Sequence, residues 1–355
     1  MAKRKSAETS TSEEAGAPDP LHPRLTHTHF GHEAAEDLFL SAFNARSLHH
    51  AWLLTGERGI GKATFAYRAA RFLLSQDQAP ALHPASSLAV SATLPVARQI
   101  AAGAHPSLFV LGSDAEGSAS IGVESVRKLR AFLSLTSPGG WRAMIVDPAN
   151  DLTIASANAL LKAVEEPPPR TVFFLISHGA AAVMPTIRSR CIKLAFRPLD
   201  FSDFQSAVEA ACTTGDLSEP DEAAMRKLFA LAAGSPGRAV DLISGGLLAL
   251  ADKVERIMDR LPKLDHALVH ELIQSTSGAR NAEAFRRLCN LIEERIEERA
   301  KQEAIQADRR PRAASWADLW HTLRDRRLEM EALNLDKGAF LVSAFSDMER
   351  IAKKN

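Results

Sequence analysis

Short hydrophobic runs recur along the first half of the chain, and stretches of helical periodicity separate them. The runs cover residues 51–55, 107–111, 142–147, 171–177 and 191–196. Apolar runs of this length between helices are typical of parallel strands that are buried on both faces. Helical patterns occur between most of these runs, although residues 75–106 lack clear periodicity. Three prolines at 167–169 end the helix expected over 155–166. We therefore expect an α/β domain with a parallel sheet and flanking helices over residues 21–198.

After Pro198 the strand pattern disappears and helical periodicity replaces it. We expect two or three short helices over residues 199–248, with a turn at 234–237 between them, and an all-helical region over 249–355. Three hydrophobic stripes in that region are Phe285, Leu288, Ile292 and Ile296; Trp316, Leu319, Trp320 and Leu323; and Phe340, Leu341, Ala344, Phe345 and Met348. Each stripe predicts a core-facing helix surface, with packing on a partner subunit as the alternative. The charged run 293–299 is interpreted as a solvated helix face.

Composition limits the setting. The chain has 355 residues, enough for two to three domains, and 46% of them are hydrophobic. We expect neither a membrane span nor a secretory signal, because no long apolar run occurs, and we expect residues 1–20 to be a disordered tail. The three cysteines lack metal-ligand spacing, and His83 with His105 lacks further ligands, so we expect no metal site and a reducing, cytoplasmic setting.

Charge is balanced over the whole chain, with 43 basic and 43 acidic residues. This balance argues against a protein that binds nucleic acid strongly by itself. It is also uneven: residues 21–198 hold 17 basic against 12 acidic side chains, whereas 199–355 hold 23 against 27. We interpret the exposed basic positions Arg127, Lys128, Arg130 and Lys162 as solvated helix faces, with contacts to DNA as the alternative.

The strongest motif is Gly56-Glu-Arg-Gly-Ile-Gly61-Lys62, between a predicted strand and a predicted helix. This is the context of a phosphate-binding loop, in which Gly56, Gly59 and Gly61 let backbone N–H groups approach phosphate and Lys62 reaches the terminal phosphates. The next position normally holds Ser or Thr for Mg²⁺, but here it holds Ala63. Thr64 comes one residue later, turned about 100° around the helix. We therefore expect weakened Mg²⁺ binding and weakened hydrolysis.

Two further positions belong with this loop. Asp147 ends a predicted buried strand, which is where a carboxylate that holds Mg²⁺ is expected; taken alone, an Asp-Pro turn that ends the strand is the alternative. Pro148 follows it, where an active ATPase of this kind carries a glutamate that polarises the attacking water. Arg188 and Arg190 precede the last predicted strand. An arginine in that position can reach a nucleotide across a subunit boundary, although a solvated or salt-bridged arginine is the simpler interpretation from the residues alone.

Together these pieces resemble the clamp-loader branch of the AAA+ family over residues 21–355. The segments that carry the resemblance are 49–56, the phosphate-binding loop, 104–107, 158–167, 189–191, 234–238 and 334–336. The string Asn158 to Pro167 together with Ser189-Arg-Cys191 is the most specific part. The resemblance implies an AAA+ domain over 21–198, a helical lid over 199–248 and a C-terminal collar over 249–355 that holds a hetero-pentameric ring together.

The resemblance also implies roles for single residues. Arg190 matches an arginine finger that acts on the nucleotide of a neighbouring subunit, Ser177 the sensor-1 position, and Arg238 the sensor-2 arginine of the lid. The implied cofactor is ATP, bound weakly or statically, and the implied partners are ATPase subunits of the τ/γ type, a δ subunit, the sliding clamp and primer–template DNA. Relatives often carry a four-cysteine zinc module in the segment that corresponds to 75–106. That segment has no cysteine here, so no zinc is expected.

Three functions are compatible with the sequence. The first is a structural and activating subunit of a replicative DNA polymerase assembly that is not itself catalytic, because Ala63 and Pro148 stand where hydrolysis needs a hydroxyl and a carboxylate. The second is an active motor ATPase of the same assembly. The third is a P-loop kinase of a small substrate, against which the long helical C-terminal region argues.

Overall fold

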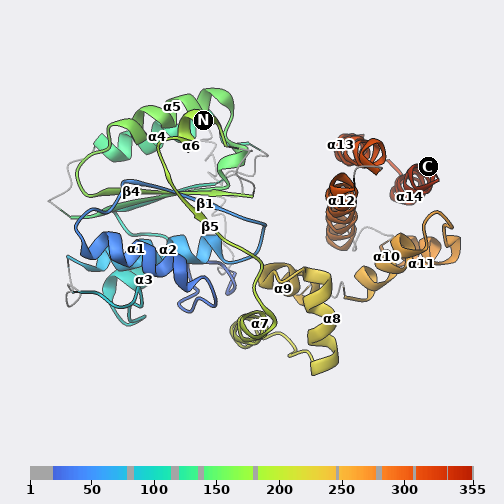
Figure 1. Cartoon of the computed structure of the whole chain (residues 1–355), viewed down its shortest axis with the longest axis horizontal. Coiled ribbons are helices and arrows are strands. Elements are labelled where there is room, and N and C mark those ends of the chain that lie inside the picture. Colours follow the sequence, from blue (N-terminus) through green and yellow to red (C-terminus); the bar gives the residue numbers. More distant parts are fainter. Residues whose placement is uncertain are drawn as a thin grey trace, which may run out of the picture. The chain divides into compact units, whose positions relative to one another are not determined.

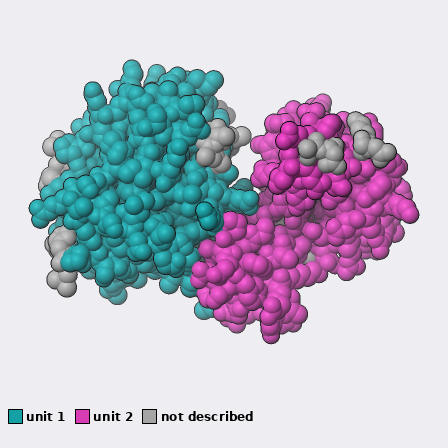
Figure 2. Space-filling view, in the orientation of Figure 1, with its two compact units in different colours: residues 1–197, 213–216 teal, residues 198–212, 217–355 magenta. Residues whose placement is uncertain are grey.

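The structure is a computed structural model that describes residues 19–77, 84–112, 120–134, 140–178, 183–244, 248–276, 282–306, 309–333 and 335–353. The chain divides into two compact units, residues 1–197 with 213–216 and residues 198–212 with 217–355 (Figure 2). The expected disordered tail lies almost wholly outside the described residues. Within the described ranges, no helix is both long and apolar enough to cross a membrane.

The first unit is built on a parallel sheet of five strands. These are β1 (Ala51–Thr55), β2 (Leu108–Gly112), β3 (Arg142–Asp147), β4 (Thr171–Ser177) and β5 (Ile192–Ala195). They lie in the order β2-β3-β4-β1-β5, and every neighbouring pair is parallel. The carboxyl ends of β1, β3 and β4 therefore meet at one edge of the sheet. This arrangement confirms the predicted α/β P-loop domain.

Helices cover both faces of the sheet (Figure 1). One face carries α1 (Glu33–Asn44), α2 (Lys62–Ser75) and α3 (Pro95–Ala101); the other carries α4 (Val123–Ser134), α5 (Ile154–Glu165) and the short α6 (Pro185–Arg188). Successive strand side chains point to opposite faces, so Leu53 enters the core under α4–α6 while Leu54 enters the core under α1–α3. Both leucines are fully buried. Burial on both sides explains why the strands are continuously apolar.

The segment between α2 and β2 contains an element that the sequence pattern did not indicate. Residues 95–101 form α3, which begins at Pro95 and buries Val96 and Ile100. The segment is also held by polar contacts from α1: the Asn44 side chain donates to the carbonyl oxygen of Ala85 at 2.9 Å and accepts from its N–H at 2.8 Å. A fold without cysteines in this region thus fixes the segment with an amide side chain and a small apolar core.

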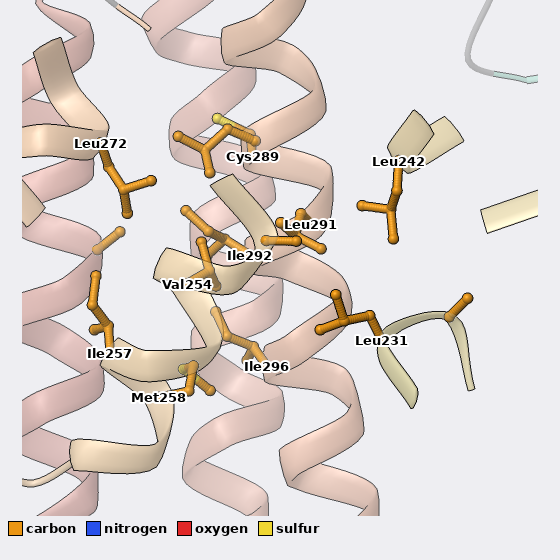
Figure 3. Packing of buried hydrophobic residues seen from close by; sticks show 14 of the residues in the cluster. Leu231, Leu242, Val254, Ile257, Met258, Leu272, Cys289, Leu291, Ile292 and Ile296 are labelled. Carbon is orange, nitrogen blue, oxygen red and sulfur yellow. The ribbon is translucent and has the colours of Figure 1, made fainter. Parts of the chain in front are cut away.

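The second unit is helical, as predicted. Its helices are α7 (Phe201–Gly215), α8 (Glu222–Ala232), α9 (Pro236–Ser244), α10 (Leu248–Arg260), α11 (His266–Thr276), α12 (Ala282–Ile305), α13 (Arg310–Leu333) and α14 (Lys337–Ala352). One continuous hydrophobic cluster runs through it, and Figure 3 shows Val254 of α10 beside Ile292 and Ile296 of α12. Most members of the three predicted stripes are buried in this cluster, with Trp320 and Phe340 at its edge. The stripes are therefore confirmed as core-facing.

The predicted connection at 234–237 lies between α8 and α9, although α9 already begins at Pro236, a residue that is well suited to the first turn of a helix. One local prediction in this unit is wrong. The charged run on α12 is not a solvated face. Glu293 is 9% exposed and pairs with Arg327 of α13 at 3.1 Å, while Arg295 pairs with Glu255 of α10 at 3.2 Å. Most of the run is instead partly buried, and its side chains pair both with other helices and within α12, which helical spacing alone does not reveal.

Candidate nucleotide site and exposed arginine

The loop between β1 and α2 has the backbone geometry that its glycines predict. Gly56, Gly59 and Gly61 have φ values of 147°, 78° and 100°, in the region that residues with a Cβ rarely adopt. A Cβ on Gly56 would lie 2.4 Å from the carbonyl oxygen of Phe196 and 2.6 Å from Ile60 Cδ1. The first glycine is thus required both by its conformation and by the close approach of Phe196, the residue that follows β5.

Lys62 is folded back onto the loop that precedes it. Its Nζ donates to the carbonyl oxygen of Gly56 at 2.8 Å and to that of Glu57, and the side chain is only 3% exposed. Burial lowers the pKa of this ammonium to about 8, against the opposing charges of Asp147 and Glu57. The ammonium is therefore held where phosphate would be bound, in a poorly hydrated setting in which an anion would stabilise it.

The carboxyl edge of the sheet brings other predicted positions to this loop. Ser177 is the last residue of β4, lies in register with Thr55 at the end of β1, and is fully buried. Asp147 is the last residue of β3, the strand on the other side of β4, and is partly exposed. Burial raises the pKa of Tyr67 on α2 to about 12, and the negative charge of Asp147 adds to this rise. The loop, Asp147 and Ser177 thus share one edge of the sheet.

The Mg²⁺ side of the site is incomplete compared with a P-loop ATPase. Ala63 occupies the position that follows the lysine, and the partly buried Thr64 lies one residue further along α2. Pro148 follows Asp147 and leads into a short 3-10 turn, Ala149–Asp151. The chain therefore places a carboxylate beside the loop but supplies neither the hydroxyl nor the adjacent acid that the motif normally provides.

Two histidines at the site were not found from the sequence. His178 directly follows β4, and its backbone N–H donates to Asn150 Oδ1 at 3.1 Å, which ties the ends of β3 and β4 together. Desolvation and the positive charges of Lys62 and Arg58 lower the pKa of His178 to about 4. His29 lies beside Gly61, because a Cβ there would be 3.2 Å from His29 Nε2. Neither residue belongs to a motif, so only the register of β4 beside β1 could have indicated His178.

Arg190 lies outside this edge, on the turn after α6. Its Nη2 lies 2.6 Å from Glu165 Oε1 on α5, and its Nη1 donates to the carbonyl oxygen of Thr186 at 2.9 Å. Both side chains of the ion pair remain 39% exposed. The guanidinium is thus oriented by two partners and still accessible from outside the chain.

Arg238 is on α9, in the second unit. It is 12% exposed and pairs with two carboxylates of α12, Glu294 at 3.0 Å and Glu298 at 2.9 Å. The basic positions on α4 and α5 are exposed, as the solvated-face interpretation predicts. They are Arg127, Lys128, Arg130 and Lys162.

Residues 31–200 match the family model described as DNA polymerase III, delta subunit. The curated relatives include the DNA polymerase III subunit delta′ of Pseudomonas aeruginosa, 37% identical over 198 residues, which are 55% of this chain and 56% of the relative. They also include the subunit gamma/tau of Mycobacterium bovis, 30% identical over 257 residues, which are 71% of this chain and 43% of the relative. The chain spans little more than half the length of the first curated relatives it matches.

Among solved structures, a DNA polymerase III gamma subunit-related protein from Thermotoga maritima resembles the chain with a TM-score of 0.43 and 15% identity. The alignment covers 89% of this chain and all of that chain.

Proposed function

We propose that the chain is a structural and activating subunit of a clamp loader, because residues 31–200 match the family model described as DNA polymerase III, delta subunit, and relatives 32–38% identical carry the name delta′. In this role it helps to load the sliding clamp onto primed DNA during replication. It supplies Arg190 to the nucleotide site of a neighbouring ATPase subunit and hydrolyses little or no ATP itself.

The observation that carries this proposal is a contrast within the chain. Arg190 is accessible from outside, whereas the chain's own phosphate-binding loop lacks the hydroxyl and the acid that hydrolysis of ATP needs. Arg190 is held by Glu165 and Thr186 with its side chain still accessible. An arginine inserted beside a bound nucleotide stabilises the charge that develops on the transferred phosphoryl group. Ala63 and Pro148 stand where the chain's own site would need a hydroxyl and an acid.

Static binding of ATP is the proposed state of the chain's own site. The glycine backbone conformations and the buried ammonium of Lys62 fit a triphosphate, since phosphate replaces carbonyl oxygens with a full negative charge. Asp147 and Ser177, at the same edge of the sheet, are the further proposed ligands, and Thr64 is the nearest hydroxyl for a metal ion. Arg238 is the proposed ligand from the lid. ATP supplies a bound anion that fixes the loop, and no hydrolytic step is assigned to this site.

The proposed partners are τ/γ-type ATPase subunits and a δ subunit in a hetero-pentameric ring, with the sliding clamp and primer–template DNA reached through the complex. Residues 199–248 are proposed to serve as the lid and residues 249–355 as the collar that joins the ring. Balanced charge over the chain supports contact with DNA through the assembly rather than by this subunit alone.

An active ATPase is the second candidate, and the similarity to a gamma/tau subunit over 257 residues favours it. Hydrolysis of ATP by the isolated chain that Lys62→Ala abolishes would select this candidate over the first. The missing hydroxyl at Ala63 and the proline after Asp147 are the features that weigh against it.

The test of the proposed function is the ATPase rate of a reconstituted loader that contains Arg190→Ala. We expect the subunits to assemble normally and DNA-stimulated hydrolysis to fall, by up to about 10³-fold at the site that Arg190 serves. Arg188→Ala, two residues earlier on the same segment, is the matched control and should retain the wild-type rate. An unchanged rate with Arg190→Ala rejects the role in activation.

A further inference from the structure

Arg190 is oriented by one carboxylate that comes from a different helix. The Glu165 Oε1 atom lies 2.6 Å from Arg190 Nη2, while the other terminal nitrogen donates to the carbonyl oxygen of Thr186 at 2.9 Å and to Ser189 Oγ at 3.4 Å. Thr186 and Ser189 belong to the segment that carries Arg190. Glu165 is therefore the one partner among the described residues that ties this guanidinium to the body of the domain.

Both residues of this ion pair project from well-packed segments of backbone. Glu165 is the last residue of α5, which three prolines terminate at 167–169, and Val164 beside it is fully buried. On the arginine side, Ile187 of α6 is buried in the same hydrophobic cluster, and Cys191 Sγ donates to the Ile187 carbonyl oxygen at 3.2 Å. The carboxylate and the arginine thus project from two elements whose backbones are fixed by one core.

The pair matters for orientation more than for stability. Ion pairs that remain this exposed contribute little to the free energy of unfolding, because water screens the charges and both side chains lose rotamer freedom. The same loss of freedom is useful when an arginine must meet a ligand, since a side chain already held in place need not be ordered on contact. Glu166, the next residue, is also exposed, but none of its contacts in the described chain reaches Arg190.

We propose that Glu165 is a positioning residue: it holds the Arg190 guanidinium in the conformation that enters the nucleotide site of the neighbouring subunit. This inference rests on the proposed function. It adds that the finger is preorganised within its own chain before the partner binds nucleotide, and that the glutamate next to the triple proline is the residue responsible.

The experiment compares Glu165→Gln with Glu166→Gln in the reconstituted loader. We expect Glu165→Gln to lower kcat of DNA-stimulated ATP hydrolysis roughly three- to tenfold with KM for ATP unchanged, because the arginine is still present but less often oriented. Glu166→Gln removes the same charge from the neighbouring position and should match wild type. Glu165→Asp keeps the charge on a shorter side chain and should recover part of the rate. Thermal unfolding of each subunit should stay within about 2 °C of wild type.

The double variant Glu165→Gln, Arg190→Ala separates this inference from the function on which it rests. If Glu165 acts through Arg190, the double variant is no slower than Arg190→Ala alone. A wild-type rate for Glu165→Gln while Arg190→Ala is slow overturns the positioning role and leaves the finger. A reduced rate for Glu165→Gln that persists in the Arg190→Ala background also overturns it, because the carboxylate then acts by another route. Wild-type rates for both single variants reject the finger and its positioning together.

Discussion

Arg238 donates from Nη1 to Glu298 Oε1 at 2.9 Å, and this one carboxylate also accepts from Arg295 Nη1 at 2.6 Å. The carboxylate therefore lies between an arginine of α9 and an arginine of its own helix. Arg238 and Arg295 are 12% and 11% exposed, so water replaces these contacts poorly. Arg295 also reaches the carbonyl oxygen of Leu231 in α8 at 2.9 Å. The cluster thus links the helices proposed as the lid to the long helix of the proposed collar.

We expect Glu298→Gln to destabilise the second unit by about 1–3 kcal/mol, because two poorly exposed arginines lose a shared anion. Urea unfolding followed by circular dichroism measures this change. The matched control is Glu297→Gln on the same helix. Among the described residues its carboxylate pairs only with the exposed Lys301, at 3.0 Å, so the variant should cost less than about 0.5 kcal/mol. Equal costs for the two variants would show that the cluster adds nothing beyond a surface charge.

The same cluster shows which features of α12 could be predicted from the sequence and which could not. Helical spacing correctly gave the buried stripe of α12, since Phe285 and Ile296 are both in the core. Spacing could not give the partners of the charged positions Glu293, Glu294 and Arg295 on that helix, because these partners come from α13, α9 and α10, which tertiary packing brings together. From spacing alone, the charged run therefore predicts a solvated face, which the packing of α12 contradicts. Apolar periodicity is a local signal, whereas ion-pair partners are not local.

The residues of the candidate site likewise divide into those that the sequence predicts and those that depend on tertiary packing. Glycine spacing, the strand before it and the helix after it predicted the loop and Lys62, because a P-loop is continuous in sequence. Asp147 is predicted from its place at the end of a buried strand, whereas Ser177 is indicated only by the resemblance to the clamp-loader branch. His29 and His178 could not be predicted, since their nearness to the loop depends on how the segment before α1 lies over Gly61 and on the β1–β4 register. The helix α3 was also missed, because its seven residues are too short for a periodic pattern.

Gly56 is the glycine of the loop that should tolerate substitution least. A methyl group there would meet the backbone oxygen of Phe196 at 2.4 Å, and the residue already has a φ of 147°. We expect Gly56→Ala to lower the free energy of unfolding by about 2–4 kcal/mol, from strain and from displacement of β5. Gly122→Ala is the control, because none of the residues that the structure describes lies within 4 Å of a Cβ at that position. Thermal unfolding of the two variants should differ clearly, and similar midpoints would contradict the close packing of the loop on β5.

Asn44 should be needed to hold the segment before α3. Its amide makes two hydrogen bonds to the backbone of Ala85, at 2.8 and 2.9 Å. We expect Asn44→Ala to cost about 1–2 kcal/mol and to speed hydrogen exchange of the Ala85 amide, because both backbone groups lose their partner. Ser41→Ala, at an exposed position on the same helix, should change neither quantity. Unchanged exchange at Ala85 in Asn44→Ala would show that packing of Leu88 and Val96 holds the segment without the amide.

Nucleotide affinity should depend on pH through Lys62. Burial lowers the pKa of its ammonium from 10.5 to about 8, so the nucleotide-free chain loses this charge as the pH rises above 8. Bound phosphate favours the charged form and raises the pKa, so binding takes up a proton in that range. Affinity for a fluorescent ATP analogue should therefore be constant near pH 7 and fall by up to about tenfold per pH unit above 8.

Calorimetry in buffers of different ionisation enthalpy should detect the proton uptake at pH 8.5. Lys62→Met, which cannot titrate, should bind more weakly and lose this pH dependence. If wild-type affinity stays flat from pH 7 to 9.5, the ammonium does not contact the phosphates.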